Sequence, residues 1–229
     1  MKCSILQPHY FPWRGYFSII KKVDEFVFLD DVKFIKREWK NRNKIRKSRI
    51  STASKWLTVP IIKNTQDKTL NKALIDYKED WQNSHVNSLT EVYRKAPQFE
   101  KHSEEMFKII KTKFDYLSDL NISLVKQISK NFKIDTKFTV SSSLHTSGKK
   151  DEKLINICKA IGSDHLYANN KSKNYIDEKN FENSKINLEY QGYQQDSYVQ
   201  KSNNQTLEWI GNLSILDLIF NHGFDVSKI

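Results

Sequence analysis

Two short apolar segments near the N-terminus each end in a cluster of polar and aromatic side chains. The first, residues 3–6, runs directly into Gln7, and the second, residues 26–29, ends on the paired carboxylates Asp30 and Asp31. A strand, a turn or short helix and another strand in close succession favour parallel pairing, with both strands ending at one edge of a sheet. Open α/β sheets build their pockets at that carboxyl edge. The pattern therefore predicts a binding site formed by the residues that follow both strands.

The rest of the chain alternates between strand-like and helix-like patterns. Residues 80–133 carry apolar side chains at three- and four-residue spacing, which indicates helices, one of them capped by Ser118 or Asp119. We therefore expect an α/β fold with a mostly parallel sheet, as a single domain over 1–229 with a mainly helical insertion at about 80–133. Residues 33–54 are expected to be irregular. Further strands are expected at 56–62, 70–77, 138–140, 165–167 and 186–190.

Net charge is the unusual bulk property of this chain. Hydrophobic residues make up 38% of the sequence, too many for a disordered protein, and no segment has the pattern of a membrane span or a signal peptide. We therefore expect a soluble, cytoplasmic protein without membrane insertion. The formal net charge of +11 predicts a polyanionic or phosphate-bearing partner, and an AT-rich coding bias towards lysine is an alternative source of part of it.

Basic residues are concentrated in one segment, and coding bias does not explain that clustering. Residues 33–49 contain nine lysines and arginines against a single acidic residue, Glu38. If the centre of the segment is extended, an aromatic ring lies beside arginine and amide groups, which suits a base or sugar next to phosphates. Single-stranded nucleic acid or a solvated basic face would suit the same composition. The candidate substrate-binding residues here are Lys36, Arg37, Trp39, Asn41, Arg42 and Asn43.

The loop after the first apolar segment is stiff, because Pro8 and Pro12 each fix a backbone angle. Gln7, at the end of the predicted strand, and Tyr10 are candidate substrate-binding residues. His9 is a candidate catalytic base. The alternative interpretation for the ring-bearing residues of this loop is that they fill the core.

The carboxylate pair Asp30 and Asp31 supplies two further candidate catalytic residues. One of them could act as general base or contact sugar hydroxyls. Alternatively, Asp30 caps a turn and Asp31 pairs with Lys33 or Arg37. The spacing of histidines, cysteines and carboxylates predicts no metal site, and the residues identify no cofactor.

Three motifs in the first sixty residues belong together. They are Gln7-Pro8-x-Tyr10-x-Pro12-Trp13-x-Gly15-Tyr16-Phe17, then Asp30-Asp31-Val32, then Lys36-Arg37-x-Trp39-x-Asn41-Arg42-Asn43. With Trp56-Leu57-Thr58-Val59-Pro60 and residues 213–217, they resemble the WbqC-like family over essentially the whole chain. Members of that family are associated with gene clusters for bacterial surface polysaccharides that contain unusual amino sugars. The resemblance implies the addition of an acyl or aminoacyl group to the amine of a nucleotide-linked deoxy-amino sugar, as in O-antigen and lipopolysaccharide biosynthesis.

The resemblance and the residues together favour an N-acyltransferase or aminoacyltransferase that forms an amide on the sugar amine. Such an enzyme needs a base for the ammonium proton, with His9, Asp30 and Asp31 as candidates, and a clamp for the phosphates. Positive charge also suits an acidic acyl donor, and coenzyme A, an acyl carrier protein and an aminoacyl-tRNA all stay open. Two alternatives come from other classes of protein. One is a nucleic-acid-binding module that uses residues 33–49, and the other is a non-catalytic partner of a sugar-modifying enzyme.

Overall fold

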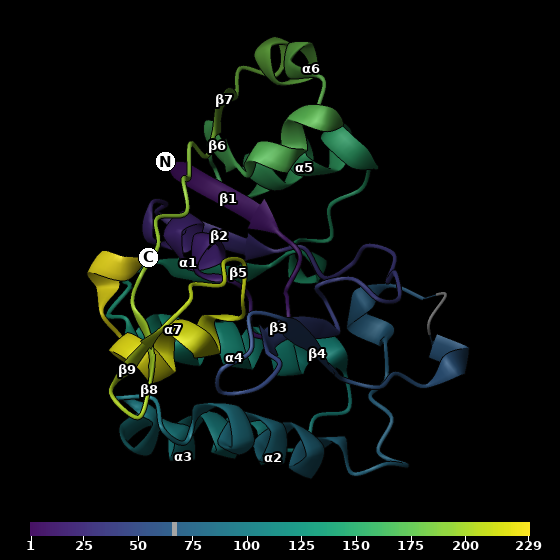
Figure 1. Ribbon diagram of the computed structural model, residues 1–229. Coiled ribbons are helices and arrows are strands. Elements are labelled where there is room, and N and C mark those ends of the chain that lie inside the picture. Colours follow the sequence, from purple (N-terminus) through teal and green to yellow (C-terminus); the bar gives the residue numbers. More distant parts are fainter. Residues whose placement is uncertain (66–67) are drawn as a thin grey trace.

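A five-stranded sheet whose strands all run parallel forms the centre of the molecule (Figure 1). The computed structural model describes residues 1–65 and 68–229. The predicted α/β fold with a mostly parallel sheet is confirmed. From one edge to the other, the strands are β5 (Lys137–Val140), β2 (Glu25–Phe28), β1 (Lys2–Leu6), β6 (His165–Ala168) and β7 (Asn187–Tyr190).

The order of the strands reverses at the middle of this sheet. From β1 the chain continues outward to β2 and β5 on one side, and it then returns to add β6 and β7 on the other side. The connections that leave β1 and β6 therefore lead to opposite faces. In open α/β sheets this switch point, at the carboxyl ends of the strands, is where ligands bind.

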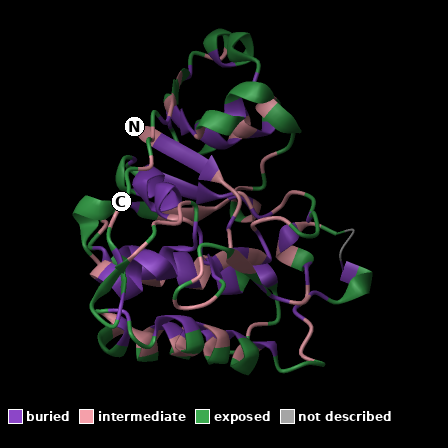
Figure 2. Ribbon diagram, in the orientation of Figure 1, coloured by how far each residue is buried: buried purple, intermediate pink, exposed green. Residues whose placement is uncertain are grey.

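Alternating side chains along the strands create a separate core on each face. Ile5 and Val27 belong to the core under α5 and α6, whereas Phe26 and Phe28 belong to the core that includes α1. Figure 2 shows buried residues along the strands and exposed residues on the outer helices. One face carries α5 (Lys150–Ala160) and α6 (Glu178–Asn183), and the other carries α1 (Arg14–Lys21), α2 (Trp81–Tyr93), α3 (Phe99–Lys111), α4 (Leu117–Asn131) and α7 (Ile215–His222) (Figure 1).

The helices α2, α3 and α4 occupy the residues that were expected to be helical. They lie between β2 and β5 in the chain, and α2 and α3 are the helices farthest from the sheet (Figure 1). Their description as an insertion in a single domain over 1–229 stays a prediction. The predicted cap at Ser118 or Asp119 is wrong, because α4 begins at Leu117 after Tyr116, whose side chain makes no capping bond.

Two antiparallel hairpins lie outside the central sheet. One pairs β3 (Arg42–Arg46) with β4 (Ser54–Thr58), and the other pairs β8 (Gln200–Ser202) with β9 (Gln205–Leu207). The expectation that residues 33–54 are irregular is therefore wrong for β3. Its buried positions include the polar Asn43 and Arg46, so the strand lacks the apolar alternation by which strands are recognised.

Residues 70–77 form no strand, contrary to expectation. They begin with the 3₁₀ helix η2 (Leu70–Lys72) and continue as irregular chain that includes an isolated bridge between Ile61 and Ile75. Leu70 and Ile75 are buried, so the apolar pattern reflects core packing of an irregular segment. The other 3₁₀ helices are η1 (Lys63–Thr65), η3 (Ser141–Leu144), η4 (Asn170–Asn174) and η5 (Val226–Lys228). Within residues 1–65 and 68–229, no helix combines the length and apolar character that crossing a membrane requires.

Candidate functional site

The loop between β1 and α1 places His9 at the switch point. The residue is half-buried, and its ring centroid lies 5.4 Å from that of Tyr16. Burial removes solvent from around the imidazole and lowers the pKa of His9 to about 3. The positive charges of Lys40 and Lys171 also lower this pKa. A histidine with this pKa is neutral at physiological pH and is a weak base. Its imidazole is better suited to a hydrogen bond with a ligand than to removing an ammonium proton.

Two lysines bring positive charge towards His9 from opposite sides of the switch point. Lys40 belongs to the basic segment and is 4% exposed, whereas Lys171 lies in η4, just after β6. Burial lowers the pKa of Lys40 to about 8, and its Nζ pairs with the carboxylate of Glu38. This end of the sheet therefore combines a neutral imidazole and the exposed ammonium group of Lys171 with the buried Lys40 and its partner Glu38. That combination suits the phosphates of a nucleotide.

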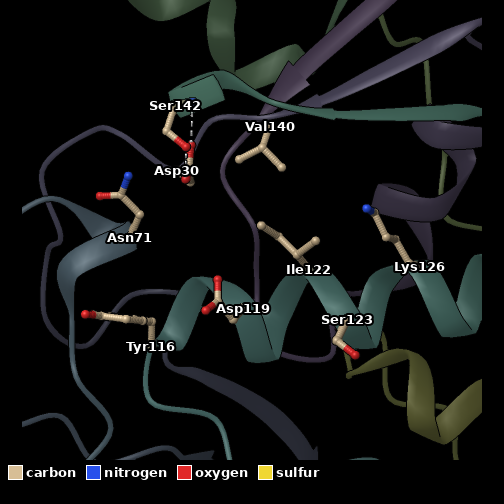
Figure 3. A pocket seen from close by; sticks show the side chains of 9 residues that line it. All are labelled: Asp30, Asn71, Tyr116, Asp119, Ile122, Ser123, Lys126, Val140 and Ser142. Atoms are coloured by element: carbon tan, nitrogen blue, oxygen red, sulfur yellow. Dashed lines mark hydrogen bonds between the residues drawn. The ribbon is translucent and has the colours of Figure 1, made fainter. Parts of the chain in front are cut away.

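A cavity of about 700 Å³ lies at the neighbouring strand ends, between β2 and β5 on one side and α4 on the other (Figure 3). The face of α4 that lines it carries Asp119, Ile122 and Lys126, which are spaced three and four residues apart. Figure 3 shows the side chains of these residues pointing from α4 toward the strand ends. Asp30 and Ser142 line the opposite wall. The cavity thus has a carboxylate on each wall and a lysine at one end.

Asp30 stands in this wall with its carboxylate already hydrogen-bonded. Its Oδ1 accepts bonds from Ser141 Oγ at 3.0 Å and from the Ser142 amide at 3.0 Å, while Oδ2 accepts from Ser142 Oγ at 2.8 Å. Asp31 accepts from Ser141 Oγ at 2.6 Å and pairs with Lys153 Nζ at 2.6 Å. Asp30 therefore links the end of β2 to η3, and Asp31 links the end of β2 to α5. Asp30 caps a turn, as in the alternative interpretation. The partners expected for Asp31 are wrong, because it pairs with Lys153 and not with Lys33 or Arg37.

Asp119 differs from this pair, because its carboxylate faces the cavity with one weak bond, from Ser118 Oγ at 3.3 Å. Partial burial raises the pKa of Asp119, and the negative charges of Asp30 and Asp115 raise it as well. A carboxylate with a raised pKa is a stronger base than an ordinary aspartate. From the sequence, Asp119 is expected as a candidate helix cap and not as a site residue. The available signal was its spacing from Ile122 and Lys126 along one helix face.

Several of the predicted residues in the loop after β1 and in the basic segment form hydrogen bonds that hold this loop in its conformation. Tyr10 is fully buried, and its hydroxyl lies 2.9 Å from His85 Nδ1, as the core-filling alternative requires. Asn43 Nδ2 donates to the carbonyls of Tyr10 at 3.2 Å and Phe11 at 2.6 Å. Phe11 has a positive φ of 39°, so these bonds stabilise a strained turn. Gln7 is half-buried, and its carbonyl accepts a bond from the hydroxyl of Tyr16.

The remaining predicted residues divide into two groups around the β3–β4 hairpin. Trp39 and Arg42 both contact Trp56, with a ring separation of 5.3 Å and a guanidinium-to-ring distance of 4.0 Å. Lys36 and Arg37 line a second cavity, of about 430 Å³, together with Asn41. Residues 36–41 form turns and Arg37 has a φ of 59°, so this part of the segment is irregular, as expected, and the extended alternative does not apply. The segment therefore does not present Arg37, Trp39 and Asn41 on one face.

Comparison with known proteins identifies the family of this chain. The family model for WbqC-like proteins matches residues 7–229. The chain belongs to the WbqC-like protein family. It is also 33% identical over 230 residues to the uncharacterized protein Rv1507c of Mycobacterium tuberculosis, a match that covers 97% of this chain and 94% of that protein. No solved structure matches the chain. The resemblance identified in the motifs is therefore confirmed at the level of the family.

Proposed function

We propose that this WbqC-like protein is an N-acyltransferase or aminoacyltransferase that forms an amide on the amine of a nucleotide-linked deoxy-amino sugar. The observation that carries the proposal is the division of charge at the carboxyl edge of the sheet. Asp30 and Asp119 line a cavity suited to an ammonium group. Lys171 is exposed and, with Lys40 and its partner Glu38, acts on His9 at the switch point, where phosphates would bind. A nucleotide-linked amino sugar carries both of these charges. The family's association with surface polysaccharides supports the same substrate.

In this proposal the sugar ammonium binds between Asp30 and Asp119. Asp30 keeps its charge fixed through its bonds to η3 and holds the ammonium, and Asp119 accepts one of its protons. The free amine then attacks the carbonyl carbon of the acyl donor and forms the new C–N bond. When the tetrahedral intermediate collapses, the bond to the donor's thiol or hydroxyl group breaks. The leaving group takes the second amine proton, and the proton on Asp119 passes to solvent.

Lys126 is the candidate for stabilising the negative oxygen of that intermediate. Its side chain extends from α4 toward the strand ends on the same face as Asp119 (Figure 3). Among the described residues it forms no ion pair, so its charge is available to a ligand. A positive charge that is fixed where an oxyanion develops lowers the barrier without reorganisation during the reaction.

Replacement of the proposed base tests this function. Asp119→Asn keeps the size of the side chain but cannot accept the proton, so turnover should fall by about 10² to 10⁴. The assay incubates nucleotide-linked amino sugars with acyl-coenzyme A, acyl carrier protein or aminoacyl-tRNA and detects the amide product by mass spectrometry. Asp135→Asn, an exposed aspartate at the opposite edge of the sheet, serves as the matched control and should leave turnover unchanged.

Two results would overturn the proposal. One is full turnover by the Asp119→Asn variant, which would remove the proposed base. The other is the absence of any nucleotide-sugar binding together with oligonucleotide binding that weakens steeply with salt. That pattern would identify the basic segment as a nucleic-acid-binding surface.

A further inference from the structure

The cavity of about 430 Å³ beside the β3–β4 hairpin is not used by the mechanism above. Lys36, Arg37 and Asn41 line it from the segment that precedes β3. Thr58, Pro60 and Ile61 line it from the end of β4 and the chain that follows. It therefore combines a cationic side with an aliphatic one. No aromatic ring is among its described lining residues.

Asn41 carries the strongest indication that this cavity binds a ligand. The residue is 6% exposed, and its Nδ2 donates to the Val59 carbonyl at 3.0 Å. Because a carbonyl accepts and does not donate, this bond fixes which way round the amide lies. The other atom, Oδ1, is buried and has no hydrogen-bond partner among the described residues. Buried polar atoms are nearly always partnered, so Oδ1 is an acceptor left open for water or for the N–H or O–H group of a ligand.

The two basic residues supply the charge for an anionic group. Lys36 and Arg37 are exposed, and neither forms an ion pair with any residue that the structure describes. Arg37 has a φ of 59°, a left-handed conformation that is uncommon for a residue other than glycine. The backbone is thus held in an unusual turn at the residue whose guanidinium lines the cavity. A guanidinium beside an ammonium group is a typical phosphate-binding pair.

Hydrogen bonds tie the segment beside this cavity to the loop after β1 and to α4. The carbonyl of Lys40, the residue before Asn41, accepts a bond from Asn121 Nδ2 at 2.7 Å. The same Nδ2 also donates to the Pro8 carbonyl at 3.0 Å. Asn121 is on α4, two residues after Asp119. Asn121 therefore fixes the residue before Asn41 relative to both the loop after β1 and α4.

We propose that the cavity lined by Lys36, Arg37 and Asn41 binds the phosphopantetheine arm of a thioester acyl donor. The assignment rests on the proposed function, because an acyl transferase needs such a donor. The phosphate would bind Lys36 and Arg37, an amide N–H or the hydroxyl of the arm would donate to Asn41 Oδ1, and the aliphatic part would lie along Pro60 and Ile61. A nucleotide base is a poorer match, since bases bind by stacking on aromatic rings and the cavity wall is aliphatic.

Calorimetric titration of the full-length protein with 4′-phosphopantetheine tests the assignment without turnover. Inorganic phosphate and pantetheine without its phosphate are the comparison ligands, and 4′-phosphopantetheine should bind at least about tenfold more tightly than either. In the double variant Lys36→Gln/Arg37→Gln, affinity for 4′-phosphopantetheine should fall by about tenfold or more. The double variant Lys47→Gln/Arg94→Gln removes the same two charge types from exposed positions elsewhere and should bind like the wild type.

Titrations with further ligands distinguish the two candidate donors, coenzyme A and an acyl carrier protein. Tighter binding of coenzyme A than of 4′-phosphopantetheine identifies coenzyme A as the donor, and tight binding of a holo-acyl carrier protein but not its apo form identifies the carrier protein. No binding of 4′-phosphopantetheine, equal binding of it by both double variants, or preferential binding of nucleoside monophosphates in this cavity would overturn the proposal. These readouts do not involve Asp119. A failure here is therefore distinguishable from a failure of the amine chemistry.

Discussion

The loop after β1 and the face of α4 both border the carboxyl edge of the sheet, but they use their polar groups differently. In the loop, polar side chains are engaged in holding the backbone, as Asn43 does for Tyr10 and Phe11. On α4, Asp119 has one weak bond and Lys126 has no ion pair within the described residues. Polar groups that complete the fold have less bonding capacity left for a ligand. The site is therefore better sought where polar groups are left open than where they are most numerous.

The largest effect expected from this comparison is on stability. Asn43→Ala removes bonds to two buried carbonyls and leaves both without partners, so the free energy of unfolding should fall by about 2–4 kcal/mol. Asn183→Ala, an exposed position at the end of α6, is the control and should change it by less than about 0.5 kcal/mol. Urea denaturation followed by tryptophan fluorescence measures both. Equal stability of the two variants would mean that the loop does not depend on Asn43.

The α4 face should behave in the opposite way. Asp119→Ala and Lys126→Ala remove side chains with few protein contacts, so each should change the free energy of unfolding by less than about 0.5 kcal/mol. Their amide-forming activity should nevertheless fall by about tenfold or more. Parallel denaturation and turnover assays on each variant provide the measurement. A stability loss like that of Asn43→Ala would remove the distinction between the two regions.

The pH dependence of turnover sharpens the role of Asp119. Its raised pKa means that the base form is reached at higher pH than for an ordinary aspartate, so turnover should rise with pH through this range. Asp115→Asn removes a negative charge that raises this pKa, and the rising limb should therefore move to lower pH while the plateau rate stays unchanged. Rate profiles of both proteins across the acidic range test this. A limb that stays in place would assign the titration to another group.

Periodicity in the sequence was sufficient for the parallel sheet and for α2, α3 and α4, because their core-facing residues repeat locally. It failed for β3, since burial there falls on Asn43 and Arg46, whose partners come from elsewhere in the chain. The two carbonyls that accept from Asn43 are 32 and 33 residues away in sequence. A pattern confined to neighbouring residues cannot distinguish such an asparagine from one that binds a ligand.

The candidate site shows the same division. Asp30 and Asp31 were visible because they follow an apolar strand, but their bonding to η3 and α5 depends on residues more than a hundred positions later. Asp119 becomes a candidate once α4 lies opposite the ends of β2 and β5 (Figure 3). Helix periodicity places it on a face, and only the topology supplies what that face contacts. The strand ends were therefore predictable, and the position of α4 opposite them was not.

The smallest expected effect concerns His9. It belongs to the loop after β1, whose polar groups mostly hold the backbone, and we expect no catalytic role for it. In the folded protein its pKa is about 3, against an ordinary value of 6.5, so below about pH 6.5 the unfolded chain binds a proton that the folded protein does not. The wild type should therefore lose stability as the pH falls from 6.5 toward 4. His9→Gln cannot be protonated and should lose less over the same interval, while its turnover at neutral pH stays within about threefold of the wild type. Melting temperatures of both proteins at several pH values test this.

His85→Gln offers a parallel case, because burial lowers the pKa of His85 to about 4 as well. If His9→Gln instead abolished turnover and left the acid sensitivity intact, the base would lie in the loop after β1, and the contrast between that loop and α4 would be lost.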